Sequence, residues 1–144
     1  MEAAQSTNNS KIKISVKDSK YATGRRKTSI AKIWLKKGSG QISINGKDYK
    51  EYFKRANHKM QLLRPFEIIN EQTSYDVRCN VKGGGLSGQV GALVHGISKA
   101  LVMFDSNSKT TLKKEKLTTR DSRAVERKKY GHRKARRSFQ FSKR

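Results

Sequence analysis

A glycine-rich stretch holds the first residues whose spacing could do chemistry. Gly83, Gly85 and Gly88 match the spacing of the dinucleotide-binding fingerprint and lie between a strand-like and a helix-like segment. Backbone amides at such a turn can approach a phosphate closely, because glycine has no side chain in the way. A dinucleotide site would need further strand–helix units, and only a short basic segment follows. We therefore expect an RNA phosphate contact here, with a plain turn and a dinucleotide site as the alternatives.

A compact basic cluster, Arg25-Arg26-Lys27, follows Gly24 and precedes a strand-like segment. Three consecutive cations could be only a solvated turn. In a chain whose formal net charge is +23, contact with a polyanion is the better interpretation. We expect these three side chains to contact phosphates.

Cysteine and histidine could form a nucleophile with its base, and Cys79 and His95 are the candidates. Cys79, however, lies on the apolar side of an alternating pattern, so a small core residue is the simpler interpretation. The histidines and Cys79 show no metal-ligand spacing. As the only cysteine, Cys79 allows no internal disulfide, which fits a reducing compartment. We expect neither catalysis nor a metal site.

The C-terminal end of the chain gives the strongest signal. Between Lys113 and Arg144 there are 14 Lys and Arg against three acids, and Tyr130, Phe139 and Phe141 stand among the charges. Arginine pairs with phosphate bidentately and stacks on bases. The segment has no apolar stripe to offset its ordering entropy, so we expect it to order only on a partner. Folded RNA fits better than duplex DNA, since no recognition helix, zinc finger or zipper is evident. A solubility device or an import signal is the alternative.

Apolar periodicity predicts the elements that must position these residues. Strands are expected at 28–36, 41–44 and 75–81, the first two joined as a hairpin by the turn at 37–40, with a tight turn at Asn45-Gly46. Helices are expected at 48–53, from Pro65 through Ile69, and at about 87–104. Ile12, Ile14 and Val16 suggest one more short strand. The last helix can cover one face of the sheet, which gives a two-layer α+β body.

Composition bounds the function classes. The 144 residues allow one domain with extensions, and 33% hydrophobic residues cannot give the whole chain a core. A charge of +23 points to nucleic acid first and to an anionic membrane second. No apolar run reaches the roughly 20 residues that span a bilayer. Met1–Ser10 reads as neither a secretory signal nor a good mitochondrial presequence.

Several stretches together resemble a known family, universal small-subunit ribosomal protein nine in its bacterial form. The resemblance covers about Tyr21 to Arg144. It is carried by YATGRRK at 21–27, VKGGGLSGQ at 81–89, HGISKAL at 95–101, TRD at 119–121, VERKK at 125–129 and QFSKR at 140–144.

The resemblance implies an α+β fold similar to the second domain of ribosomal protein five. That fold is a two-layer mixed sheet of about four strands with helices on one face, here with a long extended basic C-terminal tail. It also implies three parts: an N-terminal extension at 1–20, a globular RNA-binding domain at 21–112, and a tail at 113–144 that contacts rRNA and tRNA. The function implied is that of a structural ribosomal constituent, not an enzyme, without a cofactor or metal.

The partners implied are the 3′ major domain of the rRNA in the small-subunit head, the anticodon stem-loop of P-site tRNA, and neighbouring head proteins. No membrane or small-molecule substrate is implied. Residues expected to bind tRNA are Ser142, Lys143 and Arg144. Residues expected to bind rRNA are Arg25, Arg26, Lys27, Lys82, Gly83, Gly84, Gly85, Gln89, Arg120, Arg123, Arg127, Lys128, Lys129, Arg133, Lys134, Arg136 and Arg137.

The segment Arg136–Phe139 resembles the alphaproteobacterial and mitochondrial branch, because many other bacterial members have an arginine–proline pair where Ser138-Phe139 stands. It implies a ribosome of the mitochondrial matrix or the bacterial cytoplasm, with the mitochondrial one favoured. Two other classes stay open from the residues themselves. A free-standing RNA chaperone would act outside the ribosome, and an enzyme would need a convergent acid/base site.

Overall fold

The computed structural model describes residues 18–71 and 74–143. Its strands are β1 (Lys20–Arg26), β2 (Ser29–Lys37), β3 (Ile42–Ile44), β4 (Lys47–Asp48) and β5 (Tyr75–Lys82). Its helices are α1 (Tyr49–Tyr52), α2 (Ala56–Ile69), α3 (Leu86–Phe104) and α4 (Ser108–Lys114). The strand-like pattern at Ile12–Val16 lies outside the described residues.

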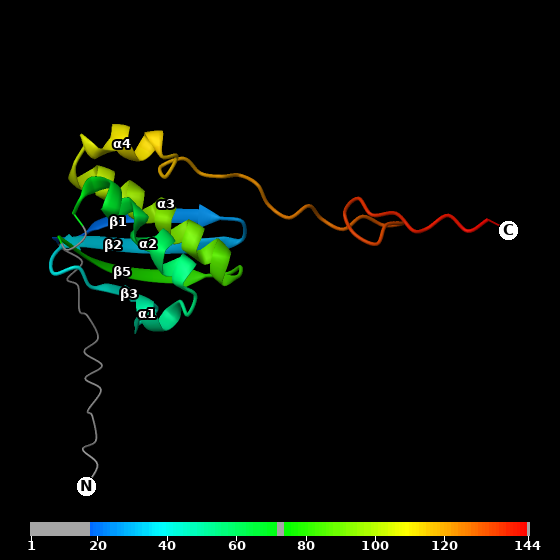
Figure 1. Ribbon diagram of the computed structural model, residues 1–144, viewed down its shortest axis with the longest axis horizontal. Helices are drawn as coiled ribbons and strands as arrows, with labels where there is room; N and C mark the ends of the chain where they lie inside the picture. Colours follow the sequence, from blue (N-terminus) through cyan, green and yellow to red (C-terminus); the bar gives the residue numbers. More distant parts are fainter. Residues whose placement is uncertain (1–17, 72–73, 144) are drawn as a thin grey trace, which may run out of the picture.

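The five strands form one mixed sheet in the order β1-β2-β5-β3-β4. β5 pairs antiparallel with β2 and parallel with β3. Helices α2 and α3 overlie one face of this sheet (Figure 1). The α+β class with a mixed sheet is confirmed, and the sheet has five strands where about four were expected.

The prediction of a hairpin between the first two predicted strands is wrong. β2 and β3 are consecutive in the chain, but β5 lies between them in the sheet. The turn at 37–40 therefore passes the start of β5 to connect β2 with β3. There the Gly38 N–H donates to the carbonyl of Ser74, the residue just before β5. The tight turn at Asn45-Gly46 is confirmed, since both residues have positive φ and join the antiparallel pair β3–β4.

Helix α2 begins nine residues before the predicted start at Pro65. It runs from Ala56 to Ile69, so the proline lies inside the helix rather than in its first turn. Its buried side includes His58, Leu62 and Phe66, at a spacing of four residues. This buried face holds the helix together, although Pro65 lacks the N–H of one backbone hydrogen bond. The predicted helices at 48–53 and 87–104 and the strand at 75–81 are confirmed within a residue or two.

The two faces of the sheet differ sharply. Alternate residues of β5, including Val77 and Cys79, are fully buried beneath the helices, together with Ile33 and Leu35 of β2. The intervening residues of the same strands face away from the helices. The core therefore lies between one sheet face and the helices, and no described helix or strand covers the second face, which we call the open face.

Strand β1 touches helix α3 at a glycine. A Cβ added to Gly24 would overlap the Ala92 carbonyl oxygen and would lie 2.6 Å from the Gly96 nitrogen. The small residues Ala22, Gly24 and Gly96 let the two backbones approach this closely. This contact sets the distance between the helix layer and the edge of the sheet.

The chain beyond α4 has no further named helix or strand up to residue 143. It leaves the body as an irregular segment that ends far from the sheet (Figure 1). The boundary expected between residues 112 and 113 falls inside α4, and the division into domains stays a prediction.

Candidate RNA interface

A cavity of about 330 Å³ opens at the start of helix α3. It lies where the loop after β5 meets the β1–β2 turn and the start of α2. Residues from these separate segments line it: Lys27, Thr28, Ser29, Arg55, His58, Gly84, Gly85, Leu86, Ser87 and Gly88. The structure thus brings the predicted glycine loop together with one residue of the predicted basic cluster, Lys27.

The glycine loop has a conformation that other residues would strain. Gly83 and Gly84 have φ of 75° and 61°. The Gly83 carbonyl accepts hydrogen bonds from the Ser29 hydroxyl at 3.0 Å and from the Gln89 side-chain amide at 3.2 Å. Gly85 is the N-cap of α3 and provides no side-chain cap. The first N–H groups of α3 are therefore left for an outside acceptor, which is the arrangement that binds phosphate.

The lining of the cavity adds positive charge. Neither Lys27 nor Arg55 forms an ion pair with any described residue. His58 is 8% exposed, and its Nδ1 is the one buried side-chain N or O atom of the described residues without a hydrogen-bond partner. Its Nε2 lies 3.3 Å from the Ser87 hydroxyl. Cationic side chains, a hydroxyl and free backbone N–H groups suit an oxyanion such as a phosphate.

Sequence reasoning missed Arg55 and His58. They precede and begin α2, a helix whose start was placed at Pro65, so nothing in the pattern tied them to the glycine loop. A period of four among His58, Leu62 and Phe66 would have located the helix. Its proximity to residues 27–29 and 84–88 depends on the tertiary fold.

The other predicted residues of the body fall in three places. Arg25 and Lys82 lie on the open sheet face. Arg26 turns toward the helix side, packs on Gly91 and pairs with Asp121 at 3.0 Å. Gln89 accepts from the Tyr52 hydroxyl at 2.8 Å, so it braces the glycine loop against α1.

The final segment is attached to the body at its beginning. Leu117 packs against the core, and Arg26 donates to the Arg123 carbonyl at 2.7 Å. Asp121 also receives bonds from the side chain and backbone of Arg123, and these lower its pKa to about 2. Arg120 and Arg123, both expected to contact rRNA, therefore stand where the segment leaves the body.

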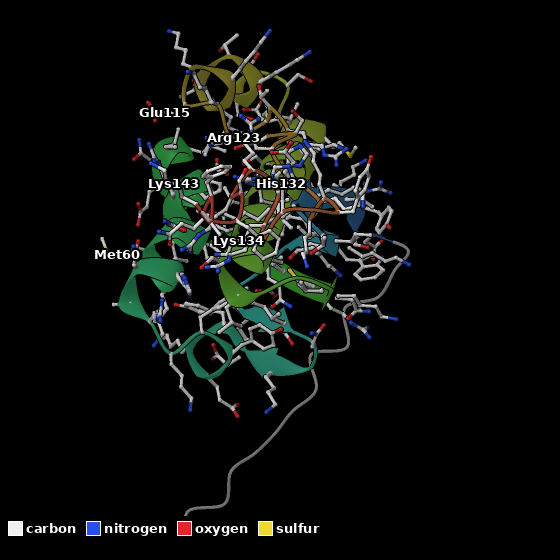
Figure 2. All side chains as sticks on the ribbon, turned by 90° about the vertical axis from the view of Figure 1, so that its right-hand side faces the viewer. Met60, Glu115, Arg123, His132, Lys134 and Lys143 are labelled. Atoms are coloured by element: carbon white, nitrogen blue, oxygen red, sulfur yellow. The ribbon has the colours of Figure 1, made fainter. Side chains whose placement is uncertain are left out.

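Beyond this attachment, the contacts of the segment with other described residues are local, as far as residue 143. Arg136 pairs with Glu126 at 2.9 Å, and the Arg133 guanidinium stacks over Phe139 at 5.3 Å from the ring centre. Figure 2 views the molecule from this end, with Arg123, His132, Lys134 and Lys143 labelled along the segment. The remaining predicted cations, Arg127, Lys128, Lys129, Lys134, Arg137 and Lys143, are exposed. Arg144 lies outside the described residues.

Among the described residues, no hydrogen bond joins Cys79 to His95, the pair considered as a nucleophile and its base. Cys79 is fully buried, and this burial raises its thiol pKa. His95 Nδ1 instead accepts from the Arg25 N–H at 3.4 Å, and burial, assisted by the Lys99 charge, lowers its pKa. Within the described residues there is no His, Cys, Asp and Glu cluster able to hold a metal, and no helix long and apolar enough to cross a membrane. β5 has an antiparallel neighbour in β2, unlike the all-parallel setting of a dinucleotide fold.

A comparison with protein families agrees with the basic, phosphate-suited surfaces described above. The family model described as ribosomal protein S9/S16 matches residues 24–144. The match includes β1 from Gly24, the glycine loop, every named helix and the final segment. Because it spans far more than half of the chain, the protein belongs to the ribosomal protein S9/S16 family.

Proposed function

We propose that the body of this chain binds rRNA of the small-subunit head through the cavity at α3, and that its final segment carries positive charge to P-site tRNA. As a member of its family, the chain is a structural ribosomal protein that binds rRNA in the small subunit. The observation that carries the finer proposal is the separation of the final segment from the body: it is exposed, rich in arginine and extends far from the sheet.

The cavity gives the body its proposed phosphate contact. A phosphate placed there would meet the first N–H groups of α3 together with the side chains of Lys27 and Arg55. The helix dipole and the two cations add in the same direction. Such contacts position a protein on RNA without reading its sequence.

The final segment divides into two proposed roles. Arg120 to Arg137 would anchor on rRNA, since most of the cations lie there. Ser142, Lys143 and Arg144 would reach the anticodon stem-loop of the tRNA. We accordingly assign 1–20, 21–112 and 113–144 to an N-terminal extension, an RNA-binding body and a tail.

Deletion of Ser142–Arg144 tests the tRNA contact. We expect purified small subunits with the deletion to bind P-site tRNA more weakly, with a log–log salt slope smaller by about 1.5 because two phosphate contacts are lost. The control is the pair Lys50→Gln and Lys109→Gln, which removes two exposed charges from α1 and α4 and should leave the tRNA affinity unchanged. Unchanged tRNA affinity after the deletion would contradict the proposal.

Assembly state separates this function from that of a free RNA chaperone. A ribosomal constituent should remain with small subunits after a moderate salt wash and sedimentation, whereas a chaperone should be released. We favour a mitochondrial host over a bacterial one because of the Ser138-Phe139 pair. A density map of the parent particle would reveal the rRNA size and the position of the tail end together.

A further inference from the structure

The open face of the sheet carries an ordered array of side chains. The register of β1, β2 and β5 places Tyr21 beside Trp34 and Trp34 beside Arg78 in one row. The next row holds Thr23, Lys32 and Asn80, and the third holds Arg25, Ile30 and Lys82. We call these nine residues the sheet platform. They come from three strands and all face away from the helices.

The aromatic row is accessible. Tyr21 is 44% exposed and its ring centre lies 5.4 Å from that of Trp34. Ile30, two rows away, is 43% exposed. Large apolar side chains in such positions bury surface only when a partner covers them. Planar aromatic rings with a guanidinium beside them are a surface on which nucleobases stack.

The positive charge of the sheet platform indicates a polyanionic partner. Arg25, Lys32, Arg78 and Lys82 are exposed, and none forms an ion pair with a described residue. The acid at the end of the same face, Asp76, already accepts backbone N–H groups from Ser39 and Gln41 at 2.8 and 2.9 Å. These four cations, which surround two aromatic rings, complement a polyanion that carries planar bases.

We propose that the sheet platform is a second RNA-binding site, which holds a single-stranded rRNA segment with its bases stacked on Tyr21 and Trp34. Lys32, Arg78 and Lys82 neutralise the phosphates of that segment. The proposal rests on rRNA being the partner of the chain, but it involves neither the cavity nor the final segment. The site lies on the sheet face opposite α3. The body can therefore bind RNA both at the cavity beside α3 and on the sheet platform.

Trp34 makes the proposal directly measurable, because it is the one tryptophan in the sequence. Its fluorescence in the full-length protein reports this face alone. We expect a single-stranded RNA 12-mer without self-complementarity to quench Trp34 emission by stacking. Heparin, a polyanion without bases, should bind the basic chain and leave the emission unchanged.

Matched variants locate the effect. Tyr21→Ala should weaken the binding seen by Trp34 at least about fivefold, the lower end of the effect of one stacked base. Met60→Ala removes an apolar side chain that is 68% exposed on α2 and lies outside the sheet platform, the cavity and the final segment, so it should leave the binding unchanged. The double variant Lys32→Gln with Arg78→Gln should also weaken binding, whereas Lys50→Gln with Lys109→Gln, which removes two exposed charges outside the sheet platform, should not. Urea unfolding of each variant checks that the fold is retained.

Two results would overturn the proposal. One is RNA binding, followed with a labelled 12-mer, that leaves Trp34 emission unchanged. The other is a photo-crosslinker at position 32 that reacts with a neighbouring protein rather than with rRNA in purified small subunits. Since deletion of Ser142–Arg144 leaves the sheet platform intact, failure here and failure of the tRNA contact give different results.

Discussion

The guanidinium of Arg26 lies 3.0 Å from the Asp121 carboxylate and donates a second hydrogen bond, 2.7 Å long, to the Arg123 carbonyl. Strand β1 thereby holds the segment that follows α4, almost a hundred residues further along the chain. Arg26 was expected to contact rRNA. In the structure its side chain fixes the direction in which the final segment leaves the body, and a direct RNA contact stays a prediction.

Arg26→Gln should release the beginning of the final segment, because the glutamine is uncharged and too short to keep both contacts. We expect lower backbone order parameters for the amides of residues 119–123 by ¹⁵N relaxation. Arg25→Gln is the control, because this substitution removes the same charge one residue earlier. Arg25 has no ion pair to a described residue. Equal order in the two variants would show that the segment is held by other contacts.

The same contact should depend on pH in a defined direction. Hydrogen bonds from the Arg123 side chain and then its backbone are the largest causes that lower the Asp121 pKa from 3.8 to about 2, and the Arg26 charge adds a smaller effect. A carboxylate whose pKa is lowered in the folded state stabilises the fold. This contribution is fully present at pH values above the ordinary pKa and is lost as the pH falls toward 2. Carboxyl ¹³C shifts should follow this titration. Arg123→Ala should raise the pKa more than Arg26→Gln does, and the reverse order would contradict the assignment.

Local sequence patterns predicted the elements that have one apolar and one polar face. They missed the elements whose residue types are explained by contacts with segments far away in the sequence. Residues 75–81 alternate because β5 packs under the helices with one face only. β1 was missed because its core positions are Ala22 and Gly24, which are small residues that allow α3 to approach rather than the large apolar residues that mark a strand. The false hairpin arose because β5, far along the chain, inserts between β2 and β3.

The candidate site was likewise predictable from the sequence only in part. Its glycine loop and Lys27 stand out as motifs, because their residue types are unusual wherever they occur. Arg55 and His58 belong to it only because α2 brings them against that loop. The sheet platform needs the strand register, which places Tyr21, Trp34 and Arg78 in one row although they are far apart in the sequence.

Gly24→Ala should be among the most damaging small substitutions in the body. The added Cβ would meet the Ala92 carbonyl and the Gly96 nitrogen, which are backbone atoms and cannot rotate away. We expect a loss of about 3 kcal/mol in the free energy of unfolding by urea titration. Gly85→Ala is the matched control, because no atom lies within 4 Å of its added Cβ, and its cost should stay below about 1 kcal/mol. A similar cost for both would contradict the close approach of β1 and α3.

Arg55→Gln should weaken rRNA binding by the body if a phosphate occupies the cavity. Arg55 has no ion pair to a described residue, so its charge is free to act on a ligand. Loss of one phosphate contact should lower the affinity for every RNA sequence alike and reduce the log–log salt slope by about 1. Titrations of labelled head-domain rRNA at several salt concentrations measure both quantities.

Arg64→Gln separates this effect from a general loss of charge. Arg64 lies on the same helix, but it is engaged by Glu115 at 2.7 Å and does not line the cavity. It should therefore leave the salt slope unchanged while removing the same charge from the protein. Lys27→Gln should repeat the result of Arg55→Gln, since Lys27 lines the cavity from the β1–β2 turn. An equal fall in slope for Arg64→Gln and Arg55→Gln would mean that only net charge matters and that the cavity holds no phosphate.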